Sequence, residues 1–424
     1  MIRIFDHVTP EKLLQREEPL LRQVETAVAE ILDAVRRQGD KALLDYSEKF
    51  DQVRPASLRV SPESMEAAWA RMPKELREAM EIAKSNILDF HKCQLRQGFA
   101  DIQSGFVRGQ RILPLDSVGI YVPGGTARYP SSILMNALPA KVAGVGRLVM
   151  VTPPDRSGVL PDVVLGAAWL ADVEEVYTVG GAHAIAGMAY GTETLPRVDK
   201  IVGPGNIYVA TAKRMVSGRV GIDMEAGPSE IIVVADGKSN PAWIAADMLS
   251  QAEHDKLASA VLLTDSRALA EAVSVEIERQ LPLLPRREIA RESINTRGMI
   301  AVTDSIDRAI ETANVLAPEH LELCVEEPFA LLGKVRHAGS VFLGRYTPEA
   351  LGDYLAGPNH VLPTAGTARF ASPLSVDDFV KRSSYICFSP EALGEVGEQA
   401  VVFARAEGLE AHARSVTIRL EDRV

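Results

Sequence analysis

Val118-Gly-Ile-Tyr-Val122, followed directly by Pro123-Gly-Gly125, is a short apolar run that ends in a glycine turn. Short apolar runs bounded by turn residues are typical of buried strands. The residues from Ser131 to Val145 then form a segment with the length and apolar content of a helix. The stretch therefore predicts a strand, a glycine turn and a helix in succession.

The same unit recurs along the chain. We predict further strands at 148–151, 175–179 and 200–202, the last two ending in Gly180-Gly181 and Gly203-Pro-Gly205, with helices at 162–170, 182–190 and 207–216. A second block has predicted strands at 231–234, 260–264, 299–302 and 340–343, and a helix over 242–254 with Asn240 as its N-cap. Repeated units of this kind build parallel sheets covered on both faces. We therefore expect an α/β fold with two Rossmann-like domains.

Composition excludes several classes of function. The 424 residues carry a formal net charge of −11 with a pI of about 5.4, and Lys and Arg form no basic block, which argues against a nucleic-acid surface. The apolar runs are short and interrupted, so no membrane span is expected, and the first residues lack a signal-peptide core, so we expect a cytoplasmic protein. The three cysteines, Cys93, Cys324 and Cys387, lie far apart, which disfavours disulfides and thiolate zinc sites.

The strongest catalytic candidate is the pair Glu319-His320. Glu and His are the side chains best suited to proton transfer near neutral pH. Pro318 disfavours helical backbone at Ala317, so we expect the helix over 306–316 to end there and the pair to lie on a loop or at the end of an element. The alternative is a solvated Glu beside a core or capping His.

Further polar residues have the chemistry of metal ligands. Gln251 and His254 are three apart on a predicted helix and share one face. Asp353 and His360 lie in one glycine-containing loop, and His412 lies near the C-terminus. Imidazole, carboxylate and amide donors suit Zn²⁺, Mn²⁺ or Co²⁺ in a site open to substrate. The alternative is a set of scattered histidines that bind no metal.

The glycine-containing turns provide a third set of candidate binding residues. Glycine at the carboxyl end of a strand lets backbone N–H groups approach a phosphate near a helix N-terminus. No turn has the GxGxxG pattern, so ordinary turns between strand and helix remain the alternative. Gly227-Pro228 presents Ser229 as a hydrogen-bond donor between two strands, or is a plain joint between them.

Several separate motifs extend from about residue 20 to the end of the chain: Tyr121-Val-Pro-Gly-Gly125, Tyr129-Pro-Ser-Ser132, Gly203-Pro-Gly-Asn206, Ile222-Asp-Met-Glu-Ala-Gly-Pro-Ser-Glu230, Ser250-Gln-Ala-Glu-His254, Ala317-Pro-Glu-His320, Asn359-His-Val-Leu-Pro363 and Gly408-Leu-Glu-Ala-His412. In content and order they resemble the histidinol dehydrogenase family. The resemblance implies oxidation of L-histidinol to L-histidine through the aldehyde, with two NAD⁺ as hydride acceptors and a Zn²⁺ that mainly holds the substrate.

The resemblance also implies roles for individual residues. The zinc ligands would be Gln251, His254, Asp353 and His412. His320 would be the proton-transferring base, and Glu319 would activate water. The substrate-binding residues would be Ser229, Gln251, His254, His320, Asp353, His360, Glu407 and His412. The NAD⁺ pocket would be lined by Tyr121, His183 and Asn206.

The chain departs from the family pattern at two positions. His183 stands where the family usually has Gln, which puts the affinity for NAD⁺ and its pH dependence in doubt, and Glu225 stands where Pro is common. The closest rival function is that of a paralogue acting on another small polar alcohol, such as a sulfopropanediol dehydrogenase. His360 and Glu407 favour histidinol over that substrate. A rival of another class is a non-catalytic ligand-binding module on the same fold.

The resemblance implies two incomplete Rossmann-like domains with parallel sheets, plus helical N- and C-terminal extensions. We expect a mainly helical region at 1–110, an NAD-binding domain at 111–236, and a domain with the metal and catalytic residues at 237–374. The helical tail at 375–424 would be swapped in a homodimer with shared active sites.

Overall fold

The computed structural model describes residues 2–6, 21–124, 128–224 and 227–421. Gly125 of the first glycine turn and Glu225 lie outside these ranges. The chain divides into two compact units. The larger comprises Met1–Gln94 and Leu115–Phe379, and the smaller comprises Leu95–Pro114 and Val380–Val424.

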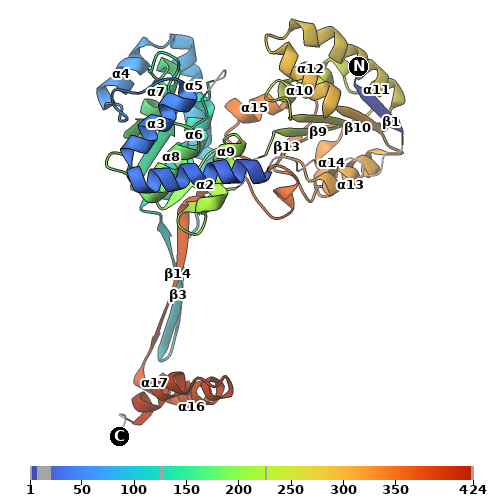
Figure 1. The fold of residues 1–424 in the computed structure, drawn as a ribbon. Helices are drawn as coiled ribbons and strands as arrows, with labels where there is room; N and C mark the ends of the chain where they lie inside the picture. The colour runs from blue at the N-terminus through green and yellow to red at the C-terminus, as the bar shows by residue number, and fades with distance from the viewer. Residues whose placement is uncertain (1, 7–20, 125–127, 225–226, 422–424) are drawn as a thin grey trace. The chain divides into compact units, whose positions relative to one another are not determined.

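The first sheet of the larger unit is parallel and has the strand order β6-β5-β4-β7-β8. Its strands are β4 (Ser117–Tyr121), β5 (Arg147–Thr152), β6 (Glu175–Thr178), β7 (Lys200–Val202) and β8 (Gly221–Ile222). One face packs on α2 (Leu21–Gln38), α3 (Asp40–Asp51), α8 (Gly181–Tyr190) and α9 (Ile207–Val216). The other packs on α4 (Pro62–Arg71), α5 (Lys74–Lys92), α6 (Pro130–Ala143) and α7 (Asp162–Leu170) (Figure 1).

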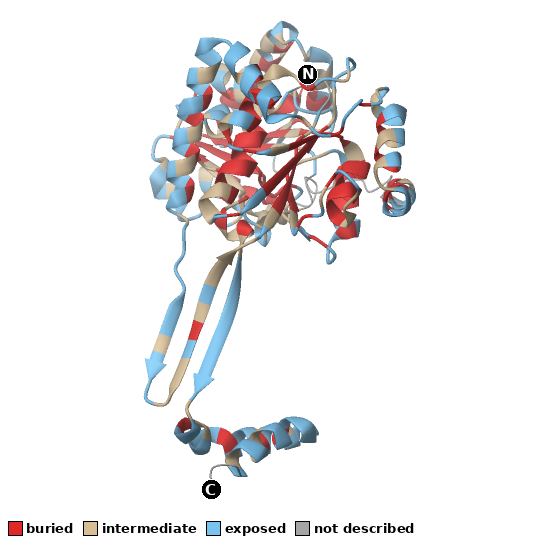
Figure 2. Cartoon of the chain, turned by 90° about the vertical axis from the view of Figure 1, so that its left-hand side faces the viewer, coloured by how far each residue is buried: buried red, intermediate tan, exposed pale blue. Residues whose placement is uncertain are grey.

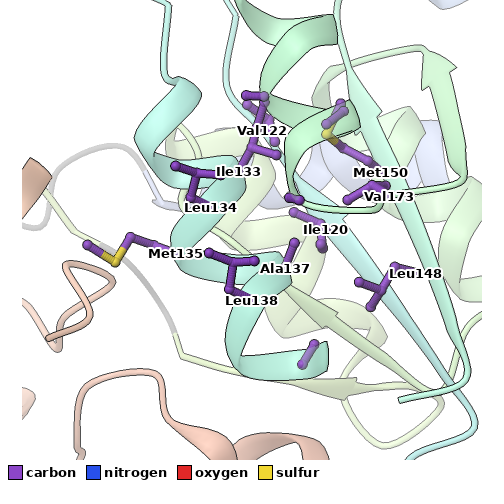
Figure 3. Close-up of a cluster of buried hydrophobic side chains, with 14 of the residues drawn as sticks. Ile120, Val122, Ile133, Leu134, Met135, Ala137, Leu138, Leu148, Met150 and Val173 are labelled. Carbon is purple, nitrogen blue, oxygen red and sulfur yellow. The ribbon is translucent and has the colours of Figure 1, made fainter. Parts of the chain in front are cut away.

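Helix α6 is deeply buried over most of its length. Its residues from Ser132 to Ala140 are all buried, and Ile133 and Leu138 lie in one apolar cluster with Ile120 of β4 (Figure 3). A helix that is apolar on every side belongs in a core. The first turn of α6 is therefore held firmly, which matters because this turn carries Ser132.

The second sheet is also parallel and has the order β1-β11-β10-β9-β12-β13. Its strands are β1 (Arg3–Asp6), β9 (Glu230–Ala235), β10 (Ser259–Thr264), β11 (Met299–Val302), β12 (His320–Cys324) and β13 (Ser340–Leu343). One face is covered by α10 (Pro241–Ala252), α11 (Arg267–Gln280) and α12 (Arg287–Thr296). The other is covered by α13 (Ile306–Leu316) and α14 (Pro328–Leu332), and α15 (Glu349–Tyr354) follows β13 (Figure 1).

The smaller unit is an antiparallel ribbon followed by two helices. The ribbon has the order β14-β3-β2, formed by β2 (Phe99–Gln103), β3 (Phe106–Pro114) and β14 (Val380–Phe388). Helices α16 (Pro390–Ala406) and α17 (Glu410–Glu421) pack on each other. Figure 2 shows that β14 and β2 are largely exposed.

The predicted fold class is confirmed, since two parallel sheets are each covered by helices on both faces. The predicted cap is also present, because the Asn240 side chain accepts a hydrogen bond from Ala242 N. The strands β1 and β2 and the start of β3 lie within the region 1–110 that was expected to be mainly helical, and β14 lies within the expected helical tail. The strands β1 and β14 pair with partners hundreds of residues away in sequence, so local patterns do not reveal them. Among the described residues, no helix is both long and apolar enough to cross a bilayer.

Candidate active site

Glu319 and His320 lie at the junction between helix α13 and strand β12. The helix ends at Leu316, and Ala317 adopts a left-handed conformation with φ of 49°. The chain then turns through Pro318, and His320 is the first residue of β12. The prediction that the helix stops before Pro318 is confirmed, and the strand that follows at once is an additional finding.

The environment of His320 determines which ring nitrogen is basic. Its side chain is almost fully buried, and Nδ1 lies 3.1 Å from the carbonyl oxygen of Glu230. A carbonyl only accepts, so Nδ1 carries a hydrogen, and Nε2 is the nitrogen that can gain or lose a proton. Nε2 has no hydrogen-bond partner among the described residues and lies 3.8 Å from both Glu349 Oε1 and Asp353 Oδ1.

Glu319 is buried beside this imidazole. Its Oε2 accepts a hydrogen bond of 2.8 Å from Glu230 N and lies 3.7 Å from His320 Nδ1. Burial raises the pKa of Glu319 to about 8, because it outweighs the attraction of the neighbouring imidazole. Burial alone would lower the pKa of His320, but the carboxylates of Glu349, Glu319 and Asp353 raise it to about 10. The site therefore gathers three carboxyl groups around one imidazole.

Of the four predicted zinc ligands, three belong to the larger unit. Gln251 is fully buried in the last turn of α10, and His254 is exposed just beyond the end of this helix. Asp353 lies on α15, where the imidazoles of His320, His360 and His254 outweigh burial and lower its pKa. His320, Glu349 and Asp353 also form a cluster whose ligand atoms all lie within 4.8 Å of one another. Clustered nitrogen and oxygen donors of this kind suit a divalent cation.

The predicted substrate contacts in the larger unit gather around the same residues. His360 Nδ1–H donates to the carbonyl of Asp353 at 3.0 Å, and its Nε2 lies 3.3 Å from Ser132 Oγ at the start of α6. Ser229 precedes β9, and its carbonyl accepts from Ser259 N at 3.0 Å. Asp353, His360 and Ser132 are therefore linked, whereas Ser229 adjoins Glu230, whose backbone contacts both Glu319 and His320.

The predicted NAD⁺ residues lie at the carboxyl edge of the first sheet. Tyr121 ends β4, its hydroxyl accepts from Gly181 N at 3.1 Å, and burial raises its pKa to about 12. Asn206 is exposed and caps α9 by accepting from the N–H groups of Tyr208 and Val209. This cap satisfies two of the N–H groups in the first turn of α9.

His183 lies deeper than a pocket-lining side chain would. It is 1% exposed, and its Nε2 lies 3.3 Å from Ser47 Oγ on α3. Burial lowers its pKa to about 3, so it is neutral at physiological pH. Its Nδ1 and the Oδ2 of Asp51 are both buried without a hydrogen-bond partner in the part of the chain that the structure describes. Unpaired polar atoms near Tyr121 fit a ligand with hydroxyl and amide groups, as a dinucleotide has.

The remaining two predicted site residues belong to the smaller unit. Glu407 is the C-cap residue of α16 and His412 lies in the first turn of α17, and both are exposed. The structure thus divides the predicted residues between the two units of the chain.

Sequence reasoning missed several residues of the site. Glu349 is buried against His320, and its spacing of four from Asp353 on one helix was a usable signal. Thr364 Oγ1 accepts from Gly227 N at 2.6 Å and so holds the turn before Ser229. The backbone of Glu230 contacts both catalytic candidates, and no side-chain pattern signals a backbone contact.

Comparison with known proteins identifies the family of this chain. Residues 14–420 match the family model described as histidinol dehydrogenase. The chain is 56% identical over 413 residues to a histidinol dehydrogenase of Bacillus cereus, covering 97% of this chain and 96% of that protein. It is 56% identical over 396 residues to a histidinol dehydrogenase of Geobacillus kaustophilus, covering 93% of each. A crystal structure of histidinol dehydrogenase from Elizabethkingia anophelis matches with a TM-score of 0.93 at 37% identity, covering 99% of this chain and 98% of that one. The chain therefore belongs to the histidinol dehydrogenase family, whose members are NAD-dependent oxidoreductases of histidine biosynthesis.

Proposed function

We propose that this protein oxidises L-histidinol to L-histidine through the aldehyde, with two NAD⁺ and a bound Zn²⁺. The observation that carries the proposal is the pairing of a buried imidazole that has one unpartnered nitrogen with a buried carboxylate next to it. Alcohol oxidation needs a base at the hydroxyl, and aldehyde oxidation needs an activated water. His320 and Glu319 supply one function each.

In the first step the alcohol loses a proton and a hydride. His320 Nε2 takes the hydroxyl proton, because Nδ1–H already donates to the carbonyl of Glu230. The C–H bond breaks with its electron pair, and the carbinol becomes an aldehyde. NAD⁺, when bound, supplies the hydride acceptor in both steps. Tyr121, Asn206 and His183 at the carboxyl edge of the first sheet are proposed to hold or support it.

In the second step water adds to the aldehyde carbon. Glu319 takes a proton from the water as the water oxygen bonds to the aldehyde carbon and the carbonyl π electrons move to oxygen. The resulting hydrate anion gives up its C–H hydrogen as a hydride to the acceptor and its remaining hydroxyl proton to His320 Nε2, which leaves the carboxylate. Glu319 Oε2 is fixed by Glu230 N, and this bond does not use the other carboxylate oxygen. Burial raises its pKa, so the ionised form of Glu319 is a stronger base than an ordinary carboxylate.

We propose that Gln251, His254 and Asp353 hold the zinc ion together with His412. The ion would bind substrate and would offset the negative charge of Asp353 and Glu349. Ser229, His360 and Glu407 are proposed to contact the substrate. The predicted domain boundaries and cytoplasmic location stay predictions.

We further propose a homodimer in which the smaller unit completes the partner's site. The smaller unit exposes many large apolar residues, which are Phe99, Ile102, Ile386, Phe388, Val402, Phe403 and Leu409. An apolar surface of this kind favours association with another chain. A second copy would bring its own Glu407 and His412 to the zinc and substrate residues.

The deciding assay measures NADH formed per molecule of histidinol. We expect two NADH per histidinol and none above background with sulfopropanediol. Turnover of sulfopropanediol alone would favour the paralogue, and binding of histidinol without NADH would favour a non-catalytic module. The family match and the presence of both His360 and Glu407 favour histidinol.

Subunit mixing tests the shared site. His320→Asn and His412→Asn proteins, each inactive alone, are mixed under conditions that exchange subunits. A mixed dimer with shared sites holds one intact and one doubly altered site, so activity returns. If mass analysis confirms mixed dimers and no activity returns, each site is built within one chain.

A further inference from the structure

A stripe of polar side chains follows one face of strand β12. Successive residues of a strand point to opposite faces, so His320, Glu322 and Cys324 share one face. Leu321 and Leu323 lie on the other face, in an apolar cluster with α13. Glu322 is 1% exposed, and the chemistry described above gives it no role. Because buried polar groups have hydrogen-bond partners, the contacts of Glu322 indicate what it does.

The carboxyl group of Glu322 holds the start of α15. The residue before this helix is Pro348, whose side chain makes no capping hydrogen bond. The first backbone N–H of the helix, that of Glu349, donates instead to Glu322 Oε1 at 2.8 Å. The first N–H groups of a helix have no partner within the helix. Glu322 therefore acts as a cap that is supplied by a strand, 27 residues earlier in the chain.

Helix α15 carries two carboxylates that face the catalytic imidazole. Glu349 Oε1 and Asp353 Oδ1 each lie 3.8 Å from His320 Nε2. The two residues are four apart, so they share one face of the helix. His320 and Glu322 are two apart on β12. One strand thus carries both the imidazole and the group that caps the helix facing it.

Helix α10 meets the same carboxyl group. Asp247 of α10, Glu322 and Cys324 form a cluster whose ligand atoms all lie within 4.8 Å of one another. Asp247 is four residues before Gln251, the proposed zinc ligand, and shares a helix face with it. Glu322 therefore lies where three elements of the candidate site meet.

We propose that Glu322 is a positioning residue that fixes α15 against β12 and thereby sets the distance of Glu349 and Asp353 from His320. It acts through the backbone N–H of Glu349. The inference deepens the proposed function and rests on it for the roles of His320 and Asp353. A displacement of roughly 1 Å can cost about a hundredfold in rate, so a cap that fixes this helix has functional value.

Two replacements separate the position of the hydrogen-bond acceptor from its charge. Glu322→Gln keeps the length of the side chain and a carbonyl oxygen for Glu349 N–H, but it lacks the charge. Glu322→Asp keeps the carboxyl group but withdraws it by one methylene. Loss of one methylene is a mild change for a core. The control Cys324→Ala shortens a buried neighbour on the same strand face and leaves the cap in place.

We expect Glu322→Asp to slow alcohol oxidation by about tenfold or more in single turnovers and to raise the zinc dissociation constant by a similar factor. Glu322→Gln and Cys324→Ala should change both quantities by less than about threefold. In the metal-free protein, amide hydrogen exchange at Glu349–Tyr354 should accelerate in Glu322→Asp alone. The thermal midpoint of each variant checks its folding.

Equal losses in Glu322→Gln and Glu322→Asp overturn the proposal, because the charge of Glu322 would then be needed. Unchanged rates and exchange in Glu322→Asp also overturn it. General unfolding of Glu322→Asp, or faster exchange throughout it, does so as well, since Glu322 would then support the core and not α15 in particular. If the unaltered protein does not oxidise histidinol, the proposed function fails, and exchange at α15 still decides whether Glu322 holds this helix.

Discussion

The candidate site residues of the two α/β parts of the larger unit lie at opposite edges of their sheets. In the first part the turns at Gly180-Gly181 and Gly203-Pro-Gly205 follow β6 and β7, at the carboxyl ends of the strands. In the second part His320 begins β12 and Glu230 begins β9, and the two strands run side by side with His320 opposite Ile231. The second site therefore lies at the amino ends of the strands, where Gln251 and His254 also arrive at the end of α10.

The difference shows what each edge provides. A carboxyl edge offers helix N-termini and glycine turns, which suit a phosphate-containing cofactor. An amino edge offers helix ends and strand starts, where the Glu230 backbone provides both a carbonyl for His320 and an N–H for Glu319. We therefore expect changes at the amino edge to affect chemistry and changes at the carboxyl edge to affect cofactor affinity.

The largest expected effect comes from the amino edge. His320→Asn should lower the rates of both oxidation steps by about 10²–10⁴, because loss of a general base typically costs that much. Glu319→Gln should slow aldehyde oxidation by a similar factor and alcohol oxidation far less. Single-turnover measurements with histidinol and with the aldehyde separate the steps. Equal losses in both steps for Glu319→Gln would contradict its water-activating role.

A smaller effect is expected from the metal ligands. His254→Asn should weaken zinc binding by at least about tenfold, because an amide is a poorer zinc ligand than imidazole. Metal content after dialysis measures this, with His337→Asn as a control outside the predicted site. Chelation should abolish turnover while the circular dichroism spectrum is retained. Full activity in metal-free protein would contradict the proposal that a bound zinc ion is needed for turnover.

At the carboxyl edge the expected effect is on binding. Asn206→Ala removes the cap of α9 and should lower the free energy of unfolding by about 1 kcal/mol. NADH affinity should fall severalfold while the rate at saturating NAD⁺ stays close to that of the unaltered protein. Titration of NADH fluorescence measures the affinity. A fall in the rate at saturating NAD⁺ without a loss of NADH affinity would contradict the expectation that the carboxyl edge affects binding and the amino edge affects chemistry.

The smallest effect concerns stability against pH. The pKa of Glu319 is about 8 in the folded protein against a usual value of 4.5. The folded state thus holds this proton more tightly than the unfolded state does. The free energy of unfolding therefore falls as pH rises from about 4.5 to 8. Glu319→Gln lacks this proton, so its thermal midpoint should exceed that of the unaltered protein by at least about 2 °C at pH 8 and by less near pH 4.5. A constant difference across this range would contradict the raised pKa.

Much of the fold was predictable because strands and helices alternate in short, well-marked units. The ranges predicted for α7, α9, α13, β7, β11 and β13 agree with the structure. The strand β12 was missed because it follows Pro318 with no turn residues between, and Ala317 reverses the chain in a left-handed conformation. Such a conformation costs an alanine energy and is not signalled by residue type.

The residue types of the candidate site could be predicted from the sequence, but their arrangement in space could not. The pair Glu319-His320 was found from its chemistry, but its dependence on the Glu230 backbone follows only from the parallel pairing of β9 and β12. Glu349 was missed because a lone Glu on a short helix is usually solvated. The predicted roles of His412 and Glu407 require a second chain and stay predictions.

The strand order of the second sheet has a consequence for synthesis on the ribosome. Arg3–Asp6 is made first and pairs with Met299–Val302, while every residue of the first sheet is made between them. At about 5–20 residues per second, the first strand waits roughly 15–60 s for its partner. The first α/β part can fold during this interval, whereas the second closes its sheet late and has a high contact order. A nascent chain stalled before residue 299 should therefore be protected from protease in its first α/β part and remain cleavable around Arg3.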